Sequence, residues 1–160
     1  MERVNRILEC PAYREHLGKN NAAEEGRRFC RHNMGHFLDV ARIAWIENLE
    51  EGLSIERELV YAAALLHDIG RHVQYEDGTP HEEAGYRIAP GILKECGFDR
   101  EEEEVILDAV VSHRDSRVKQ ERSLRGLIYR ADKLSRGCFA CEAEGECNWK
   151  NEKKNKKLIV

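Results

Sequence analysis

Apolar residues recur at helical spacing along most of the chain, and short polar segments separate these stretches. One stretch runs from about Arg27 to Leu49, and another begins near Ser54, continues through YAAALL and ends at Gly70. Apolar positions three and four residues apart line one face of an α-helix. Serine is typical of a helix start and glycine of a helix end. We therefore predict that both stretches are helices.

The second half of the chain shows the same pattern. Residues 72–80 are rich in turn-forming types and predict a loop that leads into a helix starting near His81. We expect Pro90-Gly91 to kink or divide that helix. Two further helices are predicted, from a capping box at Asp99 to about His113 and from Leu124 to Leu134. The fold is therefore predicted to be all-α, with almost no sheet.

Composition narrows the class of protein. The 160 residues fit a single domain, 1–160, with a motif core at about 27–137 and a cysteine-containing segment and basic tail at 138–160. The net charge of −4 argues against a general nucleic-acid binder. The longest apolar run, Val60 to Leu66, is too short to cross a bilayer. We expect a cytoplasmic protein with neither a nucleic-acid nor a membrane partner, and its oligomeric state stays open.

Six ionisable side chains lie on the core-facing sides of the predicted elements. His36 shares a face with Val40 and Ala44, and Asp132 follows Ile128 by one helical turn. A single inward histidine is usually a satisfied core residue, but five segments that each bury an imidazole or carboxylate are costly unless they bind metal. These ligands suit Fe, Mn, Zn or Co, and Mg is a further candidate. The predicted ligands are His36, His67, Asp68, His81, His113 and Asp132.

The same segments resemble a known family. HFLDVARIA, ALLHDIGR, HEEAG, VVSHRDSR and IYRADKLSR occur in the order of the motifs of the HD superfamily of metal-dependent phosphohydrolases. The resemblance covers roughly Arg31 to Arg136, and it is closest to the bacterial HD hydrolases that split diadenosine tetraphosphate symmetrically. The HD-GYP branch is disfavoured because the GYP motif and its paired histidines are absent from the sequence. The resemblance implies a compact HD-domain fold of five or more helices.

The resemblance also implies a mechanism. A bridging Asp68 would join two metals, or the site would hold one metal if His81 and His113 do not bind. A metal-bound hydroxide would hydrolyse a phosphate ester or anhydride of a nucleotide, among which a dinucleoside polyphosphate is one candidate. A non-catalytic sensor of nucleotides or second messengers is the alternative, and a helical interaction domain with structural zinc is a third. The first metal would be held by His36, His67, Asp68 and Asp132, and the second by Asp68, His81 and His113.

Basic residues near these ligands are candidates for contacts to the phosphorylated substrate. Arg117 follows His113 by four residues, where the diadenosine-tetraphosphate hydrolases also have an arginine, and we predict that it clamps phosphate. Lys133 and Arg136 rank next. His32 is predicted to lie one helical turn before His36 and could replace it as a ligand or face the substrate. The predicted catalytic residues are Asp68, Arg117 and Lys133.

Three cysteines mark the end of the chain. Cys138, Cys141 and Cys147 have C-x2-C-x5-C spacing, whose first pair is the spacing of structural zinc sites. Cys30 or Cys10 could supply a fourth thiolate, and free thiols are the alternative. The tail NEKKNKKLIV is too charged to fold alone, and we expect it to be frayed.

Overall fold

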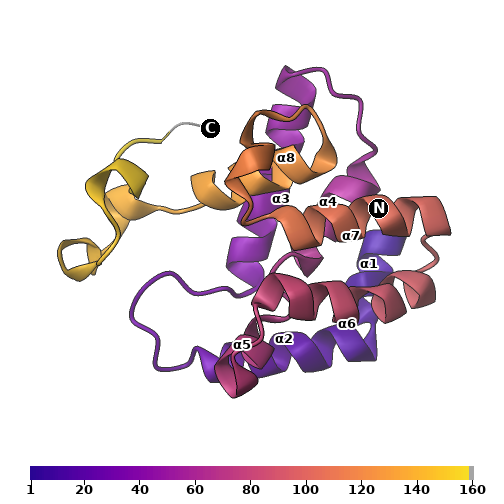
Figure 1. Cartoon of the computed structure of the whole chain (residues 1–160), viewed down its shortest axis with the longest axis horizontal. Coiled ribbons are helices and arrows are strands. Elements are labelled where there is room, and N and C mark those ends of the chain that lie inside the picture. The colour runs from indigo at the N-terminus through magenta and orange to yellow at the C-terminus, as the bar shows by residue number, and fades with distance from the viewer. Residues whose placement is uncertain (159–160) are drawn as a thin grey trace.

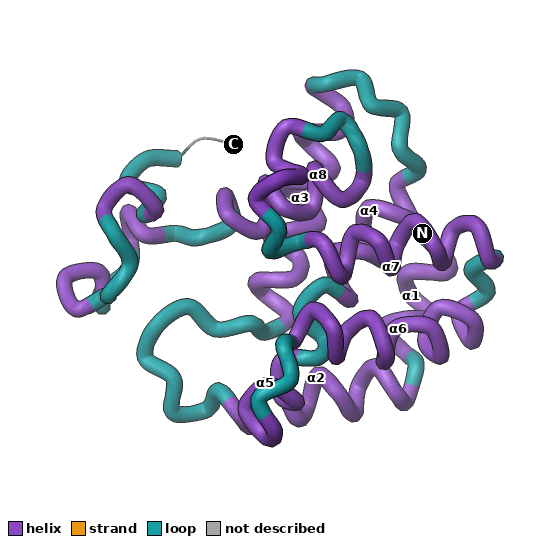
Figure 2. The backbone as a smooth tube through the Cα atoms, in the orientation of Figure 1, coloured by secondary structure: helices purple, strands orange, loops and turns teal. Residues whose placement is uncertain are grey.

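Helices make up the body of the protein in the computed structural model, which describes residues 1–158. Within that range there are eight α-helices and no strand, so the all-α prediction and that of five or more helices are confirmed (Figure 1, Figure 2). No helix in residues 1–158 is long and apolar enough to cross a membrane. The helices are α1 (Glu2–Glu9), α2 (Pro11–Ala23), α3 (Met34–Glu50), α4 (Arg57–Leu66), α5 (Arg71–Asp77), α6 (His81–Cys96), α7 (Arg100–Ser112) and α8 (Leu124–Leu134).

Helix α4 forms the centre of the helical body. Its residues Ala62 to Leu66 are fully buried, because α4 packs against α1, α3, α7 and α8. Helices α6 and α7 pack against each other, and α1 contacts α6 as well. A helix that is apolar on all sides belongs in a core. The turn that follows α4 therefore starts from a fully buried part of the molecule.

Several helix boundaries differ from the predicted ones. Helix α3 begins at Met34, with Asn33 as its N-cap, and not near Arg27. Ser54 is not an N-cap, since it has a left-handed φ of 59° and α4 starts after Glu56. Within the predicted loop 72–80, α5 is a short helix that ends at Gly78. Pro90 lies inside one continuous helix α6, so it does not divide that helix.

A C-terminal segment, residues 138–158, follows α8. It holds three short 3-10 turns, η2 (Cys138–Ala140), η3 (Glu144–Glu146) and η4 (Asn151–Lys153). In Figure 1 it stands beside the helical body, on the same side as the loop 24–33 that joins α2 to α3. The expected fraying of the tail is wrong for Asn155, whose side chain donates to the carbonyls of Lys133, Leu134 and Arg136.

Candidate metal centre

The turn after α4 carries His67 and Asp68 into the interior. The side-chain amide of Asn20 donates to the Asp68 carbonyl at 3.0 Å and accepts from the backbone N–H of His72 at 2.7 Å. Gly70 lets this turn approach α6, because a Cβ atom there would lie 2.4 Å from the backbone nitrogen of Gly85. Asn20 and Gly70 together hold the His67-Asp68 dipeptide against α6.

Four imidazoles are oriented by the same kind of hydrogen bond. The Nδ1 atoms of His67 and His113 each donate to a carbonyl on their own helix, of Ala64 and Val110, at 2.7 Å. Nδ1 of His81 lies 2.5 Å from the side-chain oxygen of Gln74. A histidine that donates through Nδ1 presents the lone pair of Nε2, which is the form that binds metal.

His36 follows the same rule through a hydroxyl. The Ser135 hydroxyl donates to the Asp132 carbonyl at 2.8 Å, and Nδ1 of His36 lies 3.3 Å from the same oxygen. Because the hydroxyl proton is already used, the ring of His36 is the donor and its Nε2 is an acceptor. All four Nε2 atoms are therefore acceptors, and that of His81 also lies 3.3 Å from Nη1 of Arg71.

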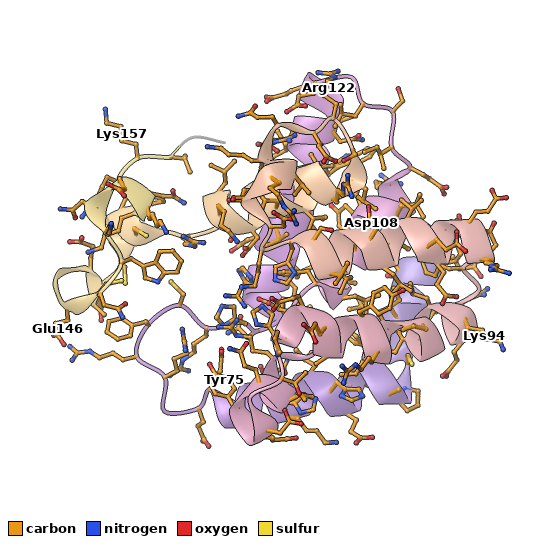
Figure 3. The ribbon with its side chains drawn as sticks, in the orientation of Figure 1. Tyr75, Lys94, Asp108, Arg122, Glu146 and Lys157 are labelled. Carbon is orange, nitrogen blue, oxygen red and sulfur yellow. The ribbon has the colours of Figure 1, made fainter. Side chains whose placement is uncertain are left out.

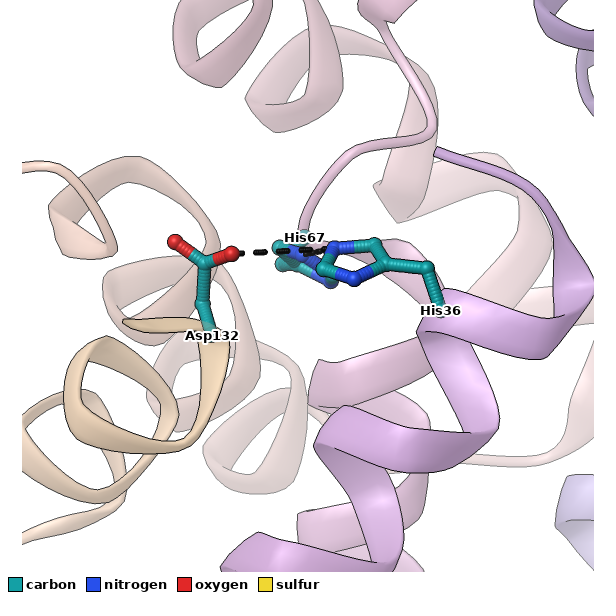
Figure 4. A group of neighbouring side chains, drawn as sticks. All are labelled: His36, His67 and Asp132. Atoms are coloured by element: carbon teal, nitrogen blue, oxygen red, sulfur yellow. Dashed lines mark hydrogen bonds and ion pairs between the residues drawn. The ribbon is translucent and has the colours of Figure 1, made fainter. Parts of the chain in front are cut away.

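His36, His67 and Asp132 form the first group of potential ligands (Figure 4). The Nε2 atoms of the two histidines are 3.2 Å apart, and that of His36 is 3.6 Å from Asp132 Oδ1. The three side chains come from α3, from the turn after α4 and from α8, which pack against one another. The ligand atoms of this group all lie within 4.8 Å of one another, so they can hold one ion.

Asp68, His81 and His113 form the second group. Asp68 Oδ1 lies 3.0 Å from His81 Nε2 and 3.5 Å from His113 Nε2. Its other oxygen, Oδ2, lies 3.3 Å from His67 Nε2 and 3.5 Å from His36 Nε2. One carboxylate thus faces both groups, as a ligand shared by two ions would.

The chemistry of these donors fits bound cations. Two unprotonated Nε2 atoms at 3.1 or 3.2 Å place lone pair against lone pair, which is unfavourable unless a cation lies nearby. Asp68 Oδ1 is buried and makes no hydrogen bond. Burial raises the pKa of Asp68, but positive charge on His67 and hydrogen bonds from protonated rings of His113 and His36 hold it well below its usual range, and a bound cation would supply the same positive charge when the rings are neutral. The site is therefore a set of acceptors built around an ionised carboxylate.

A cavity of about 610 Å³ opens onto both groups. Eight basic side chains line it against four acidic ones, although the chain as a whole carries a net charge of −4. Lys133 and Arg136 are among them, and Lys133 forms an ion pair with Asp132. This volume is in the range of small-molecule sites, and the basic lining favours an anionic ligand.

Arg117 is the predicted contact that the structure does not bring to this cavity. Its side chain lies in η1 (Ser116–Gln120), is 88% exposed and pairs with Asp115 at 2.7 Å. The prediction rested on the resemblance to the diadenosine-tetraphosphate hydrolases, which have an arginine four residues after the corresponding histidine. Helix α7 ends at Ser112, close to its predicted end, and the turn that follows directs Arg117 outward.

His32 lies near the site but not on α3, because that helix starts two residues later. Its Nε2 atom is 3.9 Å from Asp68 Oδ2, whereas that of His36 is 3.5 Å away. Its Nδ1 atom lies 2.7 Å from Glu24 Oε1. His36 is therefore better placed than His32 to join the first group, and His32 lines the cavity beside it.

Glu24 is a residue that sequence reasoning missed. It is 3% exposed, accepts from the backbone N–H of His32 at 2.6 Å and accepts from the hydroxyl of Tyr75 at 2.9 Å. Burial raises the pKa of Glu24, but the imidazole of His32 first, and then the His32 backbone N–H and the Tyr75 hydroxyl, outweigh it and lower the pKa to about 2. Glu24 thus fastens the loop 24–33 to α5. It lies in a polar stretch, EEGRR, where nothing distinguishes a buried acid from a solvated one.

Most of the chain matches a known protein family. The family model of the HD domain matches residues 33–137. A Clostridium beijerinckii protein described as uncharacterized is 48% identical over 158 residues, 99% of each chain. Ribonuclease Y of Mycoplasma mycoides is 28% identical over 102 residues, 64% of this chain and 18% of the ribonuclease. Ribonuclease Y 1 of Pediococcus pentosaceus has the same identity and coverage.

These comparisons confirm the resemblance to the HD superfamily. The relatives named here do not include a diadenosine-tetraphosphate hydrolase, so the closer resemblance to those enzymes is not confirmed. No solved structure gives a significant match to the chain.

Proposed function

Because this chain belongs to the HD-domain family, we propose that it is a metal-dependent phosphohydrolase that acts on a phosphate ester or anhydride of a nucleotide. One observation carries the proposal. Four unprotonated Nε2 atoms and the Asp68 carboxylate converge from separate segments, and Asp68 faces both groups. Divalent metals at such a site activate water and neutralise phosphoryl oxygens. The residues that would hold them are His36, His67, Asp68, His81, His113 and Asp132.

The basic cavity supports a phosphorylated substrate. Lys133 and Arg136 are basic side chains on the cavity wall, and Lys133 pairs with Asp132. We assign them to hold the phosphate oxygens, since Arg117 points away from the cavity. Arg71 is a further candidate, because its guanidinium lies 3.2 Å from the ring of His81 and lines the same cavity.

The most informative test is a phosphate-release screen over nucleotides and dinucleoside polyphosphates, with Mn, Fe, Co, Zn or Mg added. We expect metal-dependent hydrolysis of at least one compound. Metal content should be measured in wild type and in Asp68→Ala, which should lose both bound metal and activity. Unchanged metal content with residual activity in Asp68→Ala would contradict the proposed site.

The same screen separates the alternatives. A protein that binds metal and a nucleotide but releases nothing would be a metal-dependent sensor, not an enzyme. Two relatives are named as ribonucleases, although this chain matches only 18% of their length, so short RNA oligonucleotides belong in the panel. If only RNA is cleaved, the substrate is a phosphodiester bond in RNA and not a nucleotide.

A further inference from the structure

Four cysteines surround one part of the cavity wall. Cys30 comes from the loop 24–33, and Cys138, Cys141 and Cys147 come from the C-terminal segment; all four line the cavity that holds the His/Asp groups. None of them forms a disulfide bond. Cys10 and Cys96 are buried in the helical core instead, so Cys30 is the fourth cysteine of this wall.

The thiols of this wall are near enough to influence one another. Cys30 is exposed at the rim of the cavity; partial desolvation of its thiol and the charges of Cys138 and Cys141 raise its pKa, and Arg136 opposes that rise. On the other side of the segment, Lys154 has a side chain that is 7% exposed and donates to Glu144 at 2.9 Å. Lys154 acts electrostatically on Cys147 and Cys138, and Arg136 on Cys30, so positive charge is present where it would stabilise thiolates.

The C-terminal segment has no apolar core of its own to hold its shape. Ala143 is the single buried residue between 138 and 158, while Phe139 is 53% exposed and Trp149 is 43% exposed. Arg28 and Glu146 join the segment to the loop 24–33 through an exposed ion pair (Glu146 is labelled in Figure 3). Such pairs contribute little, and small units without a core are usually fastened by disulfides or metals.

We propose that Cys30, Cys138, Cys141 and Cys147 bind an iron–sulfur cluster, which fastens the C-terminal segment to the loop 24–33 at the rim of the cavity. Four cysteine thiolates are the usual ligands of such clusters, and soft thiolates select iron–sulfur clusters or zinc. The cluster is separate from the His/Asp groups, whose ligands are imidazoles and carboxylates. It does not depend on the proposed phosphohydrolase activity.

The spacing of the sulfur atoms favours the cluster over a single zinc ion. Four thiolates bound to one zinc lie about 2.3 Å from it and therefore within about 4 Å of one another. In residues 1–158, no three of these cysteines bring their sulfur atoms within 4.8 Å of one another. In a 4Fe–4S cluster each thiolate would bind a separate iron atom, so its four sulfur ligands lie farther apart than those around one zinc ion.

The test is metal and sulfide analysis of the full chain purified without oxygen. We expect iron and acid-labile sulfide in equal amounts, with the broad visible absorption of a cluster. Cys138→Ser and Cys30→Ser should each lose at least about 80% of the sulfide, while the matched control Cys96→Ser, in the helical core, should retain it. Asp68→Ala should also retain the sulfide, so failure of the proposed activity leaves this result unaffected.

Other results would overturn the proposal. One is zinc without sulfide, and another is sulfide that persists in both wall variants. A third is a folded chain that holds neither iron nor sulfide, even after incubation with ferrous iron and sulfide under reducing conditions. Circular dichroism of each variant checks that the helices are intact. Loss of sulfide from a variant that keeps its helices then reports on the cysteine ligand and not on folding.

Discussion

The His67-Asp68 turn and the C-terminal segment lie on two sides of one cavity, yet they are held in different ways. The turn follows the fully buried residues 62–66 of α4; Asn20 of α2 binds it, and Gly70 allows it to approach α6 closely. The segment contains three-residue turns, and its polar contacts are exposed or only partly buried. The wall formed by the His67-Asp68 turn, the first wall, is therefore organised before any ligand binds. The wall formed by the C-terminal segment, the second wall, depends on a few polar contacts and on the cluster that we propose its cysteines bind.

The largest effect should follow from breaking the preorganised wall. His67→Gln should lower phosphate release at least about 10³-fold, because it removes a ligand whose metal stabilises the transition state by several kcal/mol. His81→Gln removes a ligand from the second group alone, so metal content should fall from about two ions per chain to about one. Both variants should stay folded. Equal metal content in wild type and both variants would show that the two groups do not hold separate ions.

Glu24→Gln tests how the loop 24–33 is held to the body. The pKa of Glu24 is about 2 in the folded protein against an ordinary 4.5, so its charge stabilises the fold above pH 4.5, and that contribution disappears as the pH falls toward 2. The variant should lose about 3 kcal/mol of unfolding free energy at pH 7, and the difference should shrink by more than half at pH 3.

Urea unfolding at both pH values measures this difference, with the exposed neighbour Glu25→Gln as the control. A loss that is the same at pH 3 and pH 7 would mean that the packing of Glu24 matters and its charge does not. In that case packing, and not charge, would attach the loop that carries Cys30 to the helical body.

Gly70→Ala tests the close approach between the turn that carries His67 and Asp68 and the backbone of α6. An added Cβ would lie 2.4 Å from the nitrogen of Gly85 and 2.6 Å from the carbonyl oxygen of His81, which are backbone atoms that cannot turn aside. We expect a loss of about 1–3 kcal/mol, measured by thermal unfolding. Gly91→Ala, in the same helix as Gly85 and with open space around it, should be neutral or slightly stabilising. Equal stability of the two variants would refute the steric argument.

The sequence predicted the helical body well because periodic apolar stripes mark it. The six predicted ligands lie on such stripes or directly after them, and the structure brings them together. The sequence-based prediction missed α5, since RHVQYED carries no apolar stripe. It also started α3 too early, at about Arg27 within the polar loop 24–33. The groups that orient the imidazoles are largely backbone carbonyls, such as those of Ala64 and Val110, and no residue type encodes them. The direction of Arg117 could not be predicted, because its position was taken from a family resemblance and it lies in a turn after α7, where no periodicity fixes where a side chain points.

Asn155→Ala gives the smallest expected effect and acts on the second wall alone. Its side chain donates to three carbonyls at the C-terminal end of α8, at 2.8 to 3.1 Å. Loss of these bonds should lower the free energy of detaching the segment from the helical body by about 1 kcal/mol. Limited proteolysis within residues 138–158 should therefore become about fivefold faster. Thermal unfolding of the helical body should not change, and the exposed Asn151→Ala should behave as wild type.

The double variant Asn155→Ala with Cys138→Ser sharpens this last comparison. If the cysteines hold the segment by a metal cluster, removal of Asn155 alone leaves a strong attachment, and proteolysis of the double variant should exceed the product of the two single effects. If the effects of the two changes simply multiply, the polar contacts and the cysteines act independently. The C-terminal segment would then be held by separate weak contacts and not by a bound cluster. Only the helical packing around the His67-Asp68 turn would then distinguish the two sides of the cavity.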